Sequence, residues 1–102
     1  MNKLVRDGMV AVLYSPGFGA GWYTWNQECT ELMFDPAIVK LVEDENFDEL
    51  QTYVELKYPE IYKGGMMDLE IEWIREGAEF LIQEYDGNET VYVKDKVDWF
   101  TA

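Results

Sequence analysis

The stretch YSPGFGAGWYTWNQ, residues 14–27, combines a glycine-rich backbone with a large area of aromatic surface. Its glycines Gly17, Gly19 and Gly21 are spaced as G-x-G-x-G. Glycine-rich loops can hold a phosphate because their backbone N–H groups approach the anion closely. The dinucleotide-binding fingerprint has a different spacing, however, and the lysine and Ser or Thr that complete a Walker loop are missing. We therefore do not expect a nucleotide hydrolase.

Two interpretations of this loop stay open. In the first, its rings are walls on which a flat, nucleotide-like ligand stacks, while the loop amides hold a phosphate. In the second, the rings pack onto one end of a sheet and the glycines let the chain turn around them. The candidate ligand-binding residues, with basic side chains as counter-charges, are Phe18, Gly19, Gly21, Trp22, Tyr23, Trp25, Arg6, Arg75 and Lys63. The solvent exposure of Trp22 and Trp25 distinguishes the two interpretations.

Acidic residues offer a second kind of chemistry, because the chain has 21 of them against 8 basic residues and a net charge of −13. Such a surface repels nucleic acids and anionic membranes, which are bound mainly through Lys and Arg. Asp68, Glu70 and Glu72 alternate along an expected strand, where every second residue lies about 6.6 Å further on. That spacing is comparable to the spacing of phosphates along a nucleic-acid strand.

Together with the exposed faces of two expected helices, this row could imitate a nucleic-acid backbone and bind a basic protein. The candidate partner-binding residues are Glu43, Asp44, Glu45, Asp48, Glu49, Asp68, Glu70 and Glu72. The alternative is that these carboxylates form an ordinary solvated surface that only keeps the protein soluble.

Enzymatic chemistry has little support among the residues. The chain contains no histidine and a single cysteine, Cys29, so zinc sites, most redox metals and a Cys–His nucleophile are not expected. Calcium-loop spacing is missing. We expect no catalytic residue, no metal and no cofactor, and a small hydrolase is the most distant alternative.

The elements that position these residues follow from hydropathy and turn signals. The run MVAVLY, residues 9–14, is apolar on both faces, which predicts a central strand covered on both sides. Asp35 as N-cap and Pro36 at the first helical position predict a short helix. Asn46 caps a second amphipathic helix, which Pro59 ends.

Period-two patterns predict strands in the C-terminal part, at residues 69–73, 78–85 and 90–95. The sequence DGNE, residues 86–89, predicts a hairpin turn, and residues 23–27 fit either another strand or a helical turn. We predict one α+β domain over residues 1–102, with a small mixed or antiparallel sheet of about four strands and two helices packed on one face. The last three strands would form an antiparallel meander, with Trp99 and Phe100 packed on the core.

Nothing in the sequence predicts export or a membrane anchor, because no stretch approaches the ~20 apolar residues of a membrane span and no leader is recognised. A single cysteine fits a reducing compartment. We expect a cytoplasmic protein. Its oligomeric state stays open, although exposed aromatic surface on so small a domain would favour a homodimer.

Five segments resemble small uncharacterised proteins encoded by tailed bacteriophages: VAVLYSPGFGAGWYTWN (10–26), FDPAIVKLVE (34–43), KYPEIYKGG (57–65), DLEIEW (68–73) and EYDG (84–87). The resemblance implies an accessory protein of the host cytoplasm, and small acidic phage proteins often act against host defence. It carries over no functional residue. Our leading hypothesis is a non-catalytic inhibitor of a host protein that acts through its acidic surface. The alternative is a protein that sequesters a nucleotide-like ligand at residues 15–25.

Overall fold

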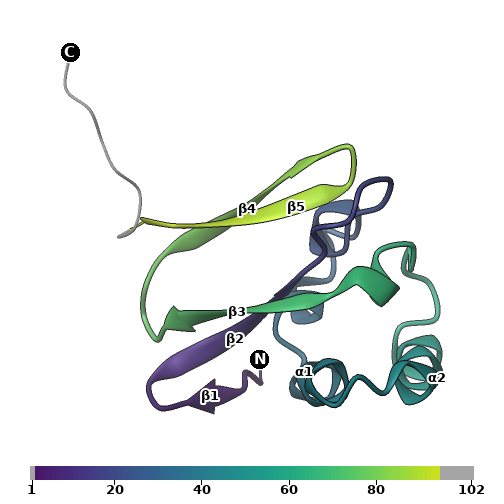
Figure 1. Ribbon diagram of the computed structural model, residues 1–102, viewed down its shortest axis with the longest axis horizontal. Coiled ribbons are helices and arrows are strands. Elements are labelled where there is room, and N and C mark those ends of the chain that lie inside the picture. The colour runs from purple at the N-terminus through teal and green to yellow at the C-terminus, as the bar shows by residue number, and fades with distance from the viewer. Residues whose placement is uncertain (1, 95–102) are drawn as a thin grey trace.

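The computed structural model describes residues 2–94 (Figure 1). The elements within this range are strands, α-helices and short 3-10 helices, in the order β1 (Val5–Arg6), β2 (Met9–Tyr14), η1 (Tyr23–Trp25), η2 (Thr30–Met33), α1 (Pro36–Glu43), α2 (Phe47–Lys57), η3 (Met66–Asp68), β3 (Glu70–Arg75), β4 (Phe80–Tyr85) and β5 (Asn88–Val93). The predicted α+β class is confirmed. None of the helices in the described range is long and apolar enough to cross a membrane.

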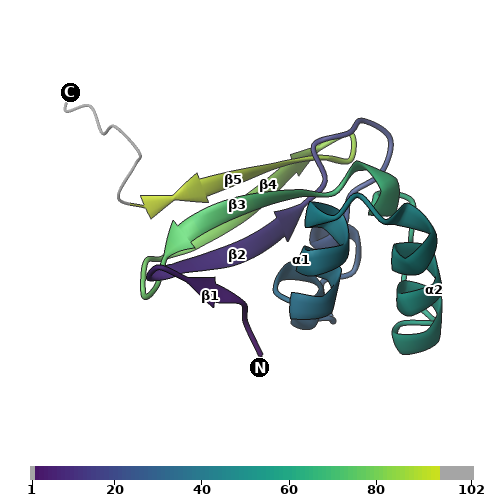
Figure 2. The same ribbon diagram turned by 60° about the horizontal axis from the view of Figure 1, so that its bottom comes forward.

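The elements are arranged in three layers (Figure 2). Strands β1, β2 and β3 form an antiparallel sheet with β2 in the middle. The helices α1 and α2 cover one face, where Ala11 and Leu13 of β2 join their core. The β4–β5 hairpin covers the other face, where Val10 and Val12 pack with it. The prediction of a central strand buried on both sides is confirmed.

The expected meander of the last three strands does not form. Strand β3 pairs with β2, whereas β4 and β5 form a separate two-stranded sheet. Ile74 of β3 shares a core cluster with Phe80 and Val93 of the hairpin. The hairpin therefore packs the apolar side chains of one of its faces by lying on the sheet instead of extending it from the edge. Residues 23–25 form η1, so the helical turn was the correct alternative for that segment.

The two α-helices begin where their caps predict. The Asp35 carboxylate accepts hydrogen bonds from the backbone N–H groups of Ala37 (2.9 Å) and Ile38 (3.4 Å), and Pro36 occupies the first turn. These bonds satisfy donors that have no partner within the helix. The Asn46 side chain accepts a bond from the N–H of Glu49 (3.3 Å) at the start of α2 in the same way.

Two Asp-Gly pairs close the hairpins. Asp7 and Gly8 have φ angles of 53° and 77°, and Asp86 and Gly87 have φ angles of 50° and 84°. Successive positive φ angles define the type I′ turn, whose twist matches the twist of paired strands. The hairpin turn predicted at residues 86–89 is thus confirmed. The expected packing of Trp99 and Phe100 concerns residues outside the described range.

Candidate functional site

The buried carboxylate of Glu89 holds the glycine-rich loop together. Its side chain is fully buried, and Oε1 accepts a hydrogen bond from the backbone N–H of Ser15 at 2.8 Å. Oε2 accepts bonds from the backbone N–H groups of Trp22 and Thr24, both at 2.9 Å, and from the Thr24 hydroxyl at 2.6 Å. The amides that we expected to hold a phosphate therefore hold a carboxylate of the same chain.

Trp22 lies in the core. Its side chain is 0% exposed, and its indole N–H donates to the carbonyl oxygen of Leu32 at 2.8 Å. The loop backbone just before Trp22 lies closely against Gly65, because a Cβ on Gly65 would lie 2.7 Å from the carbonyl oxygen of Gly21. In this arrangement Trp22 offers no surface on which a ligand could stack, so the packed interpretation of the loop describes this residue.

Other aromatic rings of the loop region remain accessible. Trp25 is 41% exposed, and Phe18 and Tyr85 are largely exposed. The Trp25 ring lies against Tyr62, with 5.0 Å between the ring centroids, and its N–H donates to Glu84 at 3.3 Å. Tyr23 is half-buried in η1. Sequence reasoning missed Tyr62, because nothing in the spacing of the chain places it beside Trp25.

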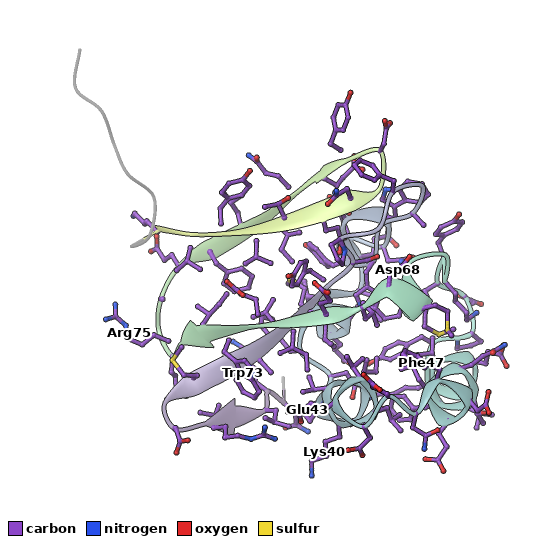
Figure 3. All side chains as sticks on the ribbon, viewed as in Figure 1. Lys40, Glu43, Phe47, Asp68, Trp73 and Arg75 are labelled. Atoms are coloured by element: carbon purple, nitrogen blue, oxygen red, sulfur yellow. The ribbon has the colours of Figure 1, made fainter. Side chains whose placement is uncertain are left out.

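The two candidate arginines do not lie near this loop. Met9, which pairs with Arg6 and Arg75, begins β2, whereas the loop follows Tyr14 at its other end. Five residue steps along a strand cover about 17 Å, and Figure 3 shows Arg75 at the opposite end of β3 from Asp68. Neither arginine can therefore serve as a counter-charge for a ligand at the loop.

Arg6 has a different role. Its guanidinium makes two hydrogen bonds to the Glu43 carboxylate, at 2.8 and 3.1 Å, and lies 5.0 Å from the centre of the Trp73 ring. Lys63 lies nearer to the loop than the arginines, because a Cβ on the adjacent Gly64 would lie 2.8 Å from the Ala20 Cβ. The Lys63 ammonium donates to the carbonyl oxygen of Pro59 at 3.2 Å.

The candidate acidic residues fall into two groups. The first, which we call the helix-end acids, lies where α1 ends and α2 begins and consists of Glu43, Asp44, Glu45, Asp48 and Glu49. All five are exposed. Within residues 2–94, Glu43 is the only member of this group in an ion pair.

The second group lies on the other side of the sheet. Ile71 and Trp73 of β3 pack with the helices, so the alternation of a strand directs Glu70 and Glu72 to the opposite face. Asp68 belongs to η3 and does not continue the strand. The expected row of three carboxylates therefore does not form. Glu70 and Glu72 also lie on the opposite face of the sheet from the helices that carry the helix-end acids.

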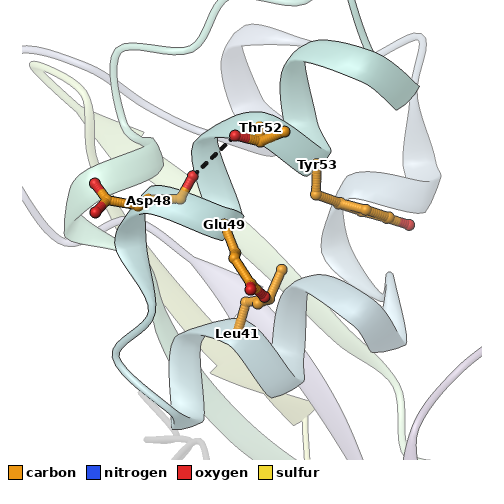
Figure 4. A pocket seen from close by; sticks show the side chains of 5 residues that line it. All are labelled: Leu41, Asp48, Glu49, Thr52 and Tyr53. Carbon is orange, nitrogen blue, oxygen red and sulfur yellow. Dashed lines mark hydrogen bonds between the residues drawn. The ribbon is translucent and has the colours of Figure 1, made fainter.

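A groove lies among the helix-end acids, between α1 and α2 (Figure 4). Its volume is about 400 Å³, and its lining residues are Leu41, Asp48, Glu49, Thr52 and Tyr53. The groove thus presents the apolar side chain of Leu41 and an aromatic ring next to two carboxylates.

Asp35 forms a second buried carboxylate network that the sequence indicated only as a helix cap. Its Oδ2 atom accepts hydrogen bonds from the hydroxyls of Tyr53 (2.8 Å) and Tyr58 (2.6 Å) and from the Lys57 ammonium (3.0 Å). Burial works to raise the pKa of Asp35, but these hydrogen bonds outweigh it and lower the pKa below its ordinary value. Burial and the Asp35 carboxylate raise the pKa of Tyr58. The network ties α2 to the start of α1.

No group of three or more potential metal ligands occurs in the part of the chain that the structure describes. Comparisons with protein-family models, curated proteins and solved structures found no match to this chain.

Proposed function

We propose that the protein is a non-catalytic binding protein whose helix-end acids bind the basic surface of a partner protein. By occupying that surface, it would exclude the phosphates of a nucleic acid and so inhibit the partner.

The main support is an imbalance in pairing. Three basic side chains of the described residues are used within the chain, in the ion pairs Arg6–Glu43, Lys57–Asp35 and Lys94–Glu79. In the same range, Asp44, Glu45, Asp48 and Glu49 pair with no basic side chain. Their charges therefore stay available for a partner, and long-range attraction would steer a basic surface toward them.

The backbone of Glu45 gives further support. Glu45 closes α1 in the left-handed region, with φ of 53°, and a residue other than glycine costs about 1 kcal/mol there. The residue is exposed, and its carboxylate makes no described hydrogen bond or ion pair. A glutamate at this position lowers stability without an internal contact in return, which is consistent with a use for its side chain in binding.

The groove between the helices suits the same partner. Asp48 and Glu49 flank its apolar lining at Leu41 and Tyr53, so the aliphatic part of a lysine or arginine would contact carbon while its charge meets a carboxylate. The competing hypothesis of a nucleotide-like ligand has less support, because Glu89 already occupies the amides of Ser15 and Trp22.

The resemblance to phage proteins makes the proposal more specific about where the protein acts and which partner it binds. In this form the protein acts in the cytoplasm of a bacterial host, and its partner is a host defence protein that binds nucleic acid.

Capture from bacterial lysate tests the proposal, with mass spectrometry of both the proteins and the small metabolites retained. The matched control carries Asp44→Asn, Glu45→Gln, Asp48→Asn and Glu49→Gln, which remove charge but keep shape. It leaves Glu43 in its ion pair with Arg6, and we call it the variant with neutralised helix-end acids. We expect the natural protein to retain a basic protein that elutes with salt and that the neutralised variant does not retain. Retention of a nucleotide instead would favour the competing hypothesis, and equal retention by both proteins would contradict a role for the helix-end acids.

A further inference from the structure

A cavity beside the glycine-rich loop combines an aromatic wall with two carboxylates. Its volume is about 460 Å³, and its lining residues are Trp25, Asn26, Gln27, Glu28, Cys29, Glu60 and Ile61. This size falls within the range of about 300–1,000 Å³ that is usual for ligand sites. We propose that the cavity binds an arginine side chain of the basic partner. The inference rests on the proposed function and names the side chain that the partner contributes.

The aromatic wall is fixed before a ligand arrives. Tyr62 supports the Trp25 ring at a centroid distance of 5.0 Å, and Glu84 accepts its indole N–H at 3.3 Å. Trp25 nevertheless stays 41% exposed. Because its orientation is already set, binding would not have to order this side chain.

Asn26 joins the two walls of the cavity. Its side-chain amide donates to the carbonyl oxygens of Trp22 and Tyr62, both at 2.9 Å, and its Oδ1 accepts the backbone N–H of Tyr62 at 2.8 Å. The two bonds to Tyr62 hold the loop against the segment that follows α2, and the bond to Trp22 fixes the Asn26 side chain within the loop. The spacing between Trp25 on one wall and Glu60 on the other is thereby maintained.

The lining chemistry selects a guanidinium over other ligands. A tryptophan ring attracts cations to its face, and arginine stacks on it better than lysine because the guanidinium is planar. Glu28 and Glu60 would accept its N–H groups, and none of the lining residues is basic. Ile61 and the half-buried Cys29 provide apolar surface for the methylene groups. The same carboxylates would repel the phosphate of a nucleotide.

The position of the cavity fits a partner that also contacts the helix-end acids. Helix α2 has Asp48 and Glu49 in its first turn, and Glu60 follows its C-terminus. Its 11 residues span about 16 Å. An extended basic segment of about five residues covers that length, so one segment along α2 would reach both sites.

Titration with an oligoarginine peptide tests the inference, with oligolysine and oligocitrulline peptides of equal length as controls. We expect the arginine peptide to shift the NMR signals of the Trp25 indole N–H and the Asn26 amide, and to slow alkylation of Cys29, the single cysteine of the chain. Oligolysine should bind about threefold more weakly and cause smaller shifts. Neutral oligocitrulline should not bind.

Variants identify the cavity as the binding place. Trp25→Leu should weaken oligoarginine binding about fivefold, and Glu28→Gln with Glu60→Gln about threefold. The matched controls, Tyr92→Leu and Glu76→Gln, change an exposed aromatic ring and an exposed carboxylate outside the cavity. They should bind as the natural protein does. Melting curves of all variants verify that each is folded.

The outcomes separate this inference from the proposed function. In one outcome, Trp25→Leu binds oligoarginine as the natural protein does, while the variant with neutralised helix-end acids does not bind it. That result overturns the arginine site in the cavity and leaves the proposed function standing. If Trp25→Leu weakens binding but neutralised helix-end acids do not, the cavity stands and the proposed function falls. If no cationic peptide binds, or a nucleotide produces the same shifts, the arginine site is overturned.

Discussion

The Glu89 carboxylate accepts the backbone N–H of Trp22 at 2.9 Å, across 67 positions of the sequence. This bond ties the glycine-rich loop to the start of β5 and fixes the loop with an anion supplied by the chain itself. It explains why a loop with the composition of a phosphate cradle buries its central tryptophan. The loop consequently has a structural role. The side chains that a partner could reach are the exposed rings beside the loop and the helix-end acids.

Substitution of Glu89 should destabilise the whole domain. Glu89→Gln removes the charge and replaces one of the two acceptor oxygens with an NH2 donor, so either the Ser15 N–H or the donors of Trp22 and Thr24 lose their acceptor. We therefore expect a loss of about 2–4 kcal/mol in the free energy of unfolding. Urea denaturation measures it. Glu79→Gln serves as the control, because Glu79 pairs with Lys94 on the surface and its side chain is 75% exposed. A loss below about 0.5 kcal/mol is expected there, and an equal loss in both variants would contradict the role of Glu89.

The local elements were predictable because their signals are local. Asp35 with Pro36 and Asn46 mark helix starts through bonds to residues at most three positions away. Strand β2 was identified from the sequence because its residues are apolar on both faces. The position of the β4–β5 hairpin was not predictable, because the choice between edge pairing and face packing depends on how Ile74 meets Val93 in three dimensions.

The candidate site shows the same limit. The composition of the loop suggested an anion site, and its amides do bind an anion, but no sequence pattern identified Glu89 as that anion. Residues that lie close in sequence, such as the helix-end acids, were correctly grouped as exposed. The arginines were misplaced relative to the loop because the distance depends on strand register, which the sequence leaves open.

Acid should weaken the domain partly through Asp35. Its pKa is lower in the folded protein than its ordinary value of 3.8, so the unfolded chain binds this proton more readily. The stabilising effect is present above about pH 4 and is lost as the pH falls through the lowered folded pKa. Asp35→Asn, which keeps a helix cap, should cost about 2–3 kcal/mol at neutral pH.

Denaturation curves between pH 7 and pH 2 measure this effect. The difference between the natural protein and the Asp35→Asn variant should shrink as the pH falls below 4. A difference that stays constant over this range would show that the Asp35 charge does not contribute.

Glycine at position 45 should separate stability from binding. Glu45→Gly relieves the left-handed backbone at φ of 53°, and we expect an increase in stability of about 0.5–1 kcal/mol. Affinity for a basic partner should fall at the same time, because one of the helix-end acids is lost. Thermal melting and a binding titration measure the two effects, and an unchanged affinity would argue that Glu45 has no part in binding.

Salt should weaken the complex if its contacts are ionic. We expect the affinity for a basic partner to fall steeply between low and physiological ionic strength, since screening acts on exposed charges. With the helix-end acids neutralised, the dependence should be shallower. Titrations of both proteins at several salt concentrations measure these slopes, and equal slopes would assign the ionic contacts to other carboxylates.

Competition between this protein and a nucleic acid tests the central claim most directly. The partner captured from lysate is first bound to a fluorescent oligonucleotide, and the unlabelled protein is then added while anisotropy is recorded. We predict that the protein displaces the oligonucleotide, and that the variant with neutralised helix-end acids needs about tenfold more to do so. A partner that binds the protein and the oligonucleotide together, or equal displacement by both proteins, would contradict the account.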